Sequence, residues 1–169
     1  MKAEEISVRV ARCGSNANVE WAQLLLFCDS RAVASILDES VGALDWQVEY
    51  TNNNANCILS IYDDIKCEWI RKENVGTPAQ MEPVKSLASD AFKRAAGYWG
   101  IGRELYSAGN IFTRNVNVTK NQRGYFEVKD KFTVQEINYD DNGNIIKLVI
   151  WNDTLGTTAF VIDKTEDKK

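Results

Sequence analysis

Two adjacent basic residues, Lys93 and Arg94, lie on the polar face of a predicted helix. The helix is expected to begin at Pro83, because proline has no N–H group to leave unpaired in a first turn. Lys85 lies two turns before Lys93 on the same face. Basic side chains that line one surface bind phosphate groups. The alternative is an ordinary solvated face, on which Asp90 and Arg94, four residues apart, form an ion pair.

Positive charge is concentrated around this helix, although the whole chain is acidic. The net charge of the 169 residues is −4, which argues against a general affinity for nucleic acid. Residues 66–103 carry seven basic and four acidic side chains, a net charge of +3, so the rest of the chain carries −7. A local basic surface is what a nucleic-acid groove requires.

The residue types exclude several kinds of catalytic and metal site. The chain has no histidine, so it lacks Ser-His-Asp and Cys-His sites. It has no CxxC pair and no GxxxxGK[ST] phosphate loop. The acidic turn N-Y-D-D-N-G lacks the glutamate of a calcium loop, because Val149 occupies that position. We therefore expect no enzymatic activity, no metal and no cofactor.

The composition predicts one domain, or a core with an appendage. Hydrophobic residues make up 44% of the chain, which is enough to build a core. No apolar run is long enough to span a membrane, and the first residues lack the apolar stretch of a signal peptide. We expect a cytoplasmic protein whose cysteines are reduced, half-buried thiols. They are Cys13, Cys28, Cys57 and Cys67.

Alternating apolar residues predict strands before the helix. We expect a hairpin at 6–11 and 19–27, and a helix from about Arg31 to Gly42, capped by Asp29 or Ser30. Three strands follow at 46–50, 58–62 and 65–70, the last two joined by a two-residue turn at Asp63-Asp64. The second helix would dock on this sheet through an apolar stripe of Val84, Leu87, Ala88, Ala91, Phe92, Ala95 and Trp99. The result is an α+β fold with a β-β-β-α core.

The last third of the chain has a different character. Residues 107–124 are polar and Asn-rich, which predicts a mobile loop with a short extended piece at 111–112. Strands are expected at 125–139 and 145–151 around the Asn142-Gly143 turn, with a third at 158–162. The predicted domains are a core at 1–106, a polar loop at 107–124, a hairpin region at 125–163 and a charged, frayed tail at 164–169.

Three stretches of this sequence resemble the Rad52-type single-strand annealing proteins, and the phage and bacterial branch most of all. The run SDAFKRAA followed by WGIGRELY is similar to the signature helix of that family. Upstream, DSRAVASILDESVGALDWQVEY resembles the entry to the family's core, and ENVGTPAQMEPVK resembles its connection into the helix. The resemblance runs from Asp29 to Tyr106.

The resemblance implies a function as well as a fold. It implies ATP-independent binding of single-stranded DNA and annealing of complementary strands in homologous recombination or DNA repair, by a homo-oligomeric ring or filament. It implies a cytoplasmic location in a bacterial or phage-infected host cell. It gives no indication of other protein partners. An alternative is a non-enzymatic interaction module that does not bind nucleic acid, and another is a metal-dependent nuclease built from Asp and Glu.

The resemblance also implies DNA-binding residues. The pair Lys93 and Arg94 would hold phosphates in a positive groove and read no base sequence. Gly97 stands one turn after Lys93, where a further basic residue would strengthen that groove. The other candidates are Lys85, Arg31, Arg103, Arg71 and Lys72.

Each of these candidates also has a structural interpretation. Lys85 would keep the helix soluble, Arg103 would pair with Glu104, and a lysine at the end of the third strand would protect a sheet edge. Tyr98 and Trp99 invite base stacking, but Trp99 continues the apolar stripe and is expected to pack in the core.

Overall fold

The computed structural model describes residues 1–17, 19–79 and 82–164. It is an α+β structure with antiparallel sheets, and it forms two compact units. Unit 1 joins Met1–Phe27 to Glu104–Lys169, and unit 2 is Cys28–Arg103. No helix among the described residues is long and apolar enough to cross a membrane. Of the predicted charged tail at 164–169, all but residue 164 lies outside the described residues.

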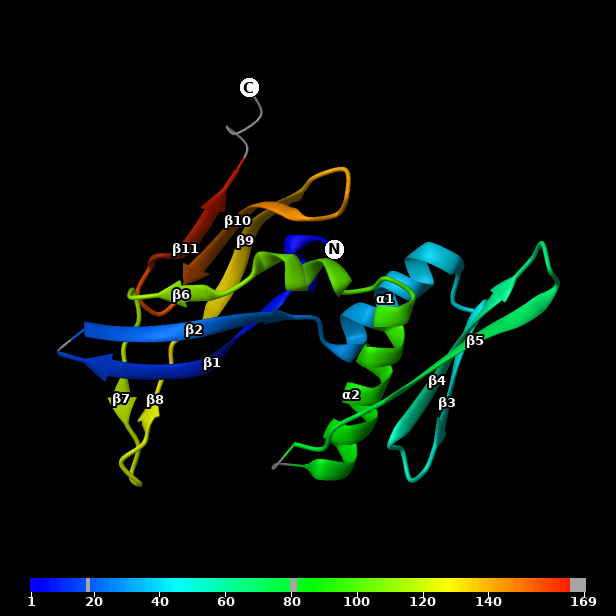
Figure 1. Cartoon of the computed structure of the whole chain (residues 1–169), viewed down its shortest axis with the longest axis horizontal. Coiled ribbons are helices and arrows are strands. Elements are labelled where there is room, and N and C mark those ends of the chain that lie inside the picture. Colours follow the sequence, from blue (N-terminus) through cyan, green and yellow to red (C-terminus); the bar gives the residue numbers. More distant parts are fainter. Residues whose placement is uncertain (18, 80–81, 165–169) are drawn as a thin grey trace. The chain divides into compact units, whose positions relative to one another are not determined.

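Unit 1 is built on a six-stranded sheet in the order β11-β10-β9-β1-β2-β6 (Figure 1). Two short helices, η1 (Ala3–Glu5) and η2 (Arg103–Ala108), and a ribbon of β7 (Thr119–Lys120) with β8 (Phe126–Glu127) accompany it. The strands of the sheet are β1 (Ser7–Asn16), β2 (Val19–Phe27), β6 (Ile111–Thr113), β9 (Phe132–Tyr139), β10 (Ile145–Asn152) and β11 (Thr157–Asp163). The predicted N-terminal and C-terminal hairpins are therefore strands of one sheet.

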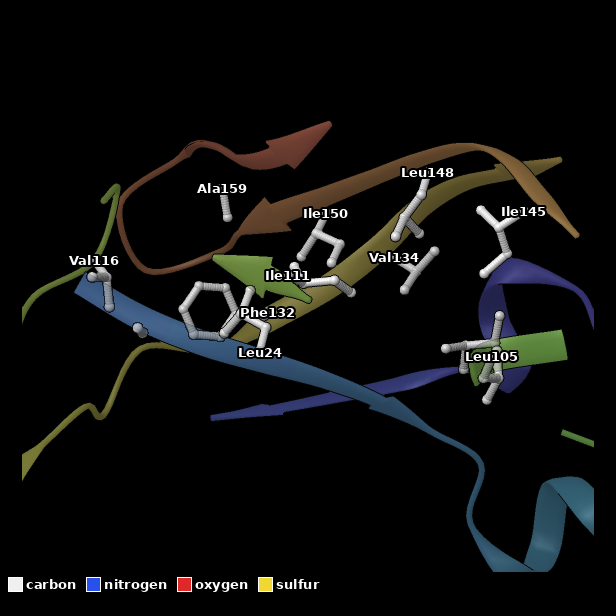
Figure 2. Close-up of a cluster of buried hydrophobic side chains, with 12 residues drawn as sticks. Leu24, Leu105, Ile111, Val116, Phe132, Val134, Ile145, Leu148, Ile150 and Ala159 are labelled. Carbon is white, nitrogen blue, oxygen red and sulfur yellow. The ribbon is translucent and has the colours of Figure 1, made fainter. Parts of the chain in front are cut away.

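The unit boundaries differ from the predicted ones because β1 pairs with β9 and β2 pairs with β6. The first two strands thus belong with the C-terminal strands and not with the β-β-β-α core. The short extended piece predicted at 111–112 is present as β6, and segment 107–124 also contains β7, which was not predicted. Its apolar residues Ile111 and Val116 are buried in the core of unit 1, shown in Figure 2.

Unit 2 contains the predicted β-β-β-α order. Helix α1 (Ser30–Val41) precedes a sheet of β3 (Trp46–Thr51), β4 (Asn56–Asp63) and β5 (Glu68–Val75), and helix α2 (Pro83–Tyr98) follows it. The predicted two-residue turn is wrong. Asp63 instead accepts hydrogen bonds from the N–H groups of Ile65 and Lys66, and β5 starts only at Glu68.

Helix α2 packs on the sheet through its second half. Ala91, Phe92, Ala95 and Ala96 are buried, while Val84, at the start of the predicted stripe, is 67% exposed. The Phe92 ring stacks on a tryptophan of β3, with 6.0 Å between the Trp46 and Phe92 ring centroids. Small alanine side chains bring the helix backbone close to the sheet, so this region tolerates little added volume.

Candidate nucleic-acid interface

Residues 74–77, at the end of β5 and directly after it, bind helix α2 and fix its position. We call this segment the strap. The Gly76 backbone passes so close to the helix that a Cβ atom there would lie 2.3 Å from the Leu87 carbonyl oxygen. The N–H group of Thr77 donates to the Asp90 carboxylate at 2.9 Å, and the side-chain amide of Asn74 donates to the Arg94 carbonyl at 3.1 Å. These contacts hold the helix with its polar face turned away from the sheet.

Helix α1 meets the middle of α2 at its first turn. The hydroxyl groups of Ser30 and Ser89 are hydrogen-bonded at 2.5 Å. Asp29 caps α1, as predicted, by accepting from the N–H groups of Arg31 and Ala32 at 2.8 Å. Since the cap uses these donors, an anion at this end of α1 would have to be held by side chains.

Three of the predicted cations gather around this contact. Lys85 and Lys93 lie one turn before and one turn after Ser89, so all three share a face of α2. Arg31 is exposed and directly follows Ser30, which touches Ser89. We call Lys85, Lys93 and Arg31 the basic row. Lys85 also lies 3.3 Å from the Glu82 carboxylate, an exposed ion pair that contributes little stability.

Arg94 lies beside the basic row and forms the ion pair expected from its spacing. Its Nε atom donates to the Asp90 carboxylate at 2.7 Å. The same carboxylate oxygen accepts from Thr77, so Asp90 both orients Arg94 and holds the strap. The predicted ion pair between Asp90 and Arg94 is therefore confirmed, and the Arg94 side chain remains 52% exposed beside the row.

Lys72 and Arg103 both bind the C-terminal end of α2. The Lys72 ammonium donates to the Tyr98 carbonyl at 3.0 Å and lies 3.9 Å from the centroid of the Trp99 ring. Arg103 donates to the carbonyl oxygens of Gly97, at 3.0 and 3.2 Å, and of Tyr98, at 3.3 Å. Cations at this end satisfy the last carbonyl groups and oppose the helix dipole. The expected pair between Arg103 and Glu104 is not what the structure shows.

Arg71 does not join the other cations. Neighbouring residues of a strand point to opposite faces of a sheet, and Lys72 takes the face that α2 covers. Arg71 therefore lies on the other face, where it pairs with Glu49 of β3 at 3.0 Å. Of the two cations predicted at the end of the third strand, Lys72 thus caps helix α2 and Arg71 forms a surface ion pair. Neither lies in the basic row.

Two other predictions concern aromatic and thiol groups. The Trp99 indole donates to the Leu59 carbonyl at 3.3 Å and is half-buried, which confirms that it packs on the sheet, whereas Tyr98 is 52% exposed. All four cysteines are free thiols, but their burial differs from the prediction. Cys67 is exposed, and Cys57 is fully buried, which raises the pKa of its thiol to about 11.

Unit 2 is acidic as a whole, and its positive charge is confined to the places where cations are grouped. The unit holds eight basic and eleven acidic residues, a net charge of −3, so an anion is attracted only where the cations are grouped. The sequence did not point to Ser89 or Gly76 as positioning residues, and it pointed to Asp90 only as the partner of Arg94. A serine at the contact of two helices and a glycine before a helix carry no local signal. Only the spacing of Asp90 and Arg94 gave one.

Comparison with curated proteins finds one relative at a significant level, the single-stranded DNA-binding protein DdrA of Deinococcus radiodurans. The two sequences are 34% identical over 93 residues, which is 54% of this chain. The chain covers 44% of the relative, less than half of its length. No protein-family model and no solved structure matches the chain. The chain is thus similar, over about half its length, to a protein named for binding and not for catalysis, in line with the expectation of no enzymatic activity.

Proposed function

We propose that this protein binds single-stranded DNA without ATP and anneals complementary strands during recombination or repair. The observation that carries the proposal is the 34% identity to a protein named for binding single-stranded DNA. A segment that covers more than half of a chain includes its midpoint, and here the midpoint falls in the first turn of α2 (Pro83–Tyr98). The similarity therefore includes part of the helix that carries the basic row.

The basic row supplies the contacts that such binding needs. Lys85, Lys93 and Arg31 would neutralise backbone phosphates, with Arg94 beside them. Each phosphate contact releases counterions, so log K falls with log salt at a slope of roughly −0.7 per contact for single strands. Phosphate contacts carry no base sequence, which suits a protein that must accept any pair of complementary strands.

Annealing requires many such contacts in register. One protomer offers only a few, so we propose a Rad52-type homo-oligomer, a ring or filament, that lines a continuous track. The sheet of unit 2 has two edge strands, β3 and β5, to which a neighbouring copy could add a strand. Bases held outward on the track would remain free to test a second strand.

An annealing assay without nucleotide or metal tests this function. Mixing two complementary labelled strands with the protein should raise the rate of duplex formation above the spontaneous rate. The Lys93→Ala/Arg94→Ala variant should lose most of this acceleration, because two cations next to the phosphate track are removed while the fold is retained. The variant should keep its fold, because losing one exposed ion pair costs only about 0.5 kcal/mol. Circular dichroism would check this.

Two results would contradict the proposal. Equal rates with and without wild-type protein would exclude annealing, and equal acceleration by wild type and variant would exclude this site. Strand cleavage that depends on magnesium would instead indicate a nuclease. Assembly without any binding of the strands would indicate an interaction module.

A further inference from the structure

Strands β1, β2 and β6 of unit 1 turn one sheet face away from the core. Ala22 and Leu24 of β2 are fully buried on the core side, where Figure 2 shows Leu24 among the other core side chains. Alternate residues of a strand point to the opposite face. We call that opposite face of β1, β2 and β6 the outer face. Its β2 positions are Val19, Trp21, Gln23, Leu25 and Phe27.

The outer face carries two aromatic side chains in contact. The ring centroids of Trp21 and Phe112 are 6.2 Å apart, and Phe112 is 52% exposed. The Trp21 indole lies directly over Gly14 of β1, where a Cβ atom would be only 3.0 Å from the ring. A glycine at this position therefore lets the indole lie flat on the sheet. With Val19 and Arg114, these rings line a hollow of about 560 Å³.

The charge of the outer face is positive. Arg9 and Arg12 face outward from β1, in register with Leu25 and Gln23, and Arg114 directly follows β6. No outward position of β1, β2 or β6 among the described residues is acidic, although the chain has 24 Asp and Glu against 20 Lys and Arg. Glu20 of β2 points inward and accepts from the Val118 N–H group at 2.9 Å.

From this combination we propose that the outer face is a second binding surface for single-stranded nucleic acid, separate from the basic row. The exposed Phe112 ring and the half-buried Trp21 indole offer stacking platforms for bases, and flanking arginines neutralise the phosphates between them. A duplex hides the faces of its bases, so this arrangement selects single strands. The three arginines fit a polyanion, and Glu127 of the neighbouring β8, which lines a hollow with Arg12 and Trp21, is already paired with Lys129 at 3.0 Å. The ligand class is that of the proposed function, but the unit and the residues differ.

Tryptophan fluorescence of the full chain tests the surface, with oligothymidylate as the probe. Stacking of a base on Trp21 should quench its emission, and the Trp21→Phe variant should lose most of the quenching while it keeps an affinity close to wild type. Phe112→Ala should weaken binding at least about fivefold, which corresponds to the low end of measured stacking contributions. Arg12→Ala/Arg114→Ala should reduce the salt slope by about 1.4.

The matched control is Tyr106→Ala, which removes an aromatic ring that is 88% exposed in η2, outside the three strands that form the outer face. It should leave affinity and quenching unchanged. Unchanged affinity and salt slope in the folded Phe112→Ala and Arg12→Ala/Arg114→Ala variants would overturn the proposal. It would also be overturned if Phe112→Ala altered only the oligomeric size, because the face would then be a contact between copies.

The same experiment separates this surface from the basic row. Reversing the charges of Lys85 and Lys93 should lower the affinity but leave the quenching of Trp21 intact at saturation. If the basic row did not bind DNA, that variant would behave as wild type while Phe112→Ala still weakened binding. Loss of Trp21 quenching in the charge-reversal variant at saturation would contradict an independent surface.

Discussion

Replacing Gly76 with alanine is expected to destabilise unit 2 by about 4 kcal/mol, a large effect for a single added methyl group. The added Cβ atom would lie 2.3 Å from the Leu87 carbonyl oxygen, 2.7 Å from the Ala91 backbone nitrogen and 3.0 Å from the Ala91 Cβ. Two of these atoms belong to the backbone of α2, so no side-chain rotation relieves the clash. The strap or the helix must move, and the Thr77–Asp90 hydrogen bond is then strained or lost.

Urea unfolding followed by circular dichroism measures this effect. The control is Gly97→Ala in the last turn of the same helix, where an added Cβ would meet no atom within 4 Å. Alanine favours helix over glycine, so this variant should be more stable than wild type by about 0.5–1 kcal/mol. A Gly76→Ala protein with the wild-type unfolding midpoint would show that the strap does not pack against α2 as described.

Asn152→Ala is expected to destabilise unit 1 by about 3 kcal/mol. The Asn152 side chain is fully buried at the end of β10. Its amide donates to the Asn115 carbonyl at 3.0 Å and to the Asp130 carboxylate at 2.8 Å. Its oxygen accepts from the N–H groups of Thr154 and Leu155 at 3.0 and 3.1 Å. Truncation removes the partner of all four groups inside a buried site.

The same urea titration with Asn142→Ala is the control for this substitution. Asn142 is exposed in the β9–β10 turn, and its backbone N–H group, which alanine keeps, donates to Asp140. The free energy of unfolding of Asn142→Ala should stay within about 0.5 kcal/mol of the wild-type value. An Asn152→Asp variant should be as damaging as Asn152→Ala, because a carboxylate cannot donate to Asp130. Wild-type stability of Asn152→Ala would mean that this network does not hold the 107–131 segment to the sheet.

Short-range sequence patterns, namely hydrophobic periodicity and capping residues, predicted most helices and strands of unit 2. Both helices, β3, β4, the Asp29 cap and the Gly42 end of α1 appear where the sequence placed them, whereas β5 begins three residues later and ends five residues later than predicted. Period and capping chemistry are local, so one sequence carries them. The pairing of β1 with β9 is different, because its residues are more than a hundred positions apart and any exposed strand edge would satisfy the same pattern.

The candidate site was predictable in its residues but not in their arrangement. The periodicity put Lys85 and Lys93 on one helix face, and the spacing predicted the Asp90–Arg94 pair. It did not show that Lys72 and Arg103 would cap the helix, because a capping cation comes from a segment that only the fold brings near. The sequence also did not show that Lys72, and not Arg71, would lie on the sheet face that α2 covers. The pattern of a strand does not say which of its faces a helix will cover.

The outer face of unit 1 was not predicted at all. Trp21, Phe112 and Arg114 come from segments about ninety residues apart, and β2 and β6 become neighbours only through the pairing of Gln23 with Phe112. The segment that contains Phe112 was expected to be a polar loop with a short extended piece at 111–112, because it is rich in asparagine, and no pairing with 19–27 was expected. Those asparagines instead form side-chain hydrogen bonds, such as those of Asn115 with Thr158 and of Asn117 with Asp130.

The central claim is that cations on α1 and α2 hold single-stranded DNA by its phosphates. Fluorescence anisotropy of labelled oligothymidylate over a range of salt concentrations tests it, with wild type, Lys85→Glu/Lys93→Glu and Lys66→Glu/Lys131→Glu. The last variant makes the same change in net charge outside the basic row. We predict that reversal in the row lowers the affinity at least about tenfold and flattens the salt slope by about 1.4, and that the control stays close to wild type. Equal affinities and slopes for all three proteins would contradict the claim.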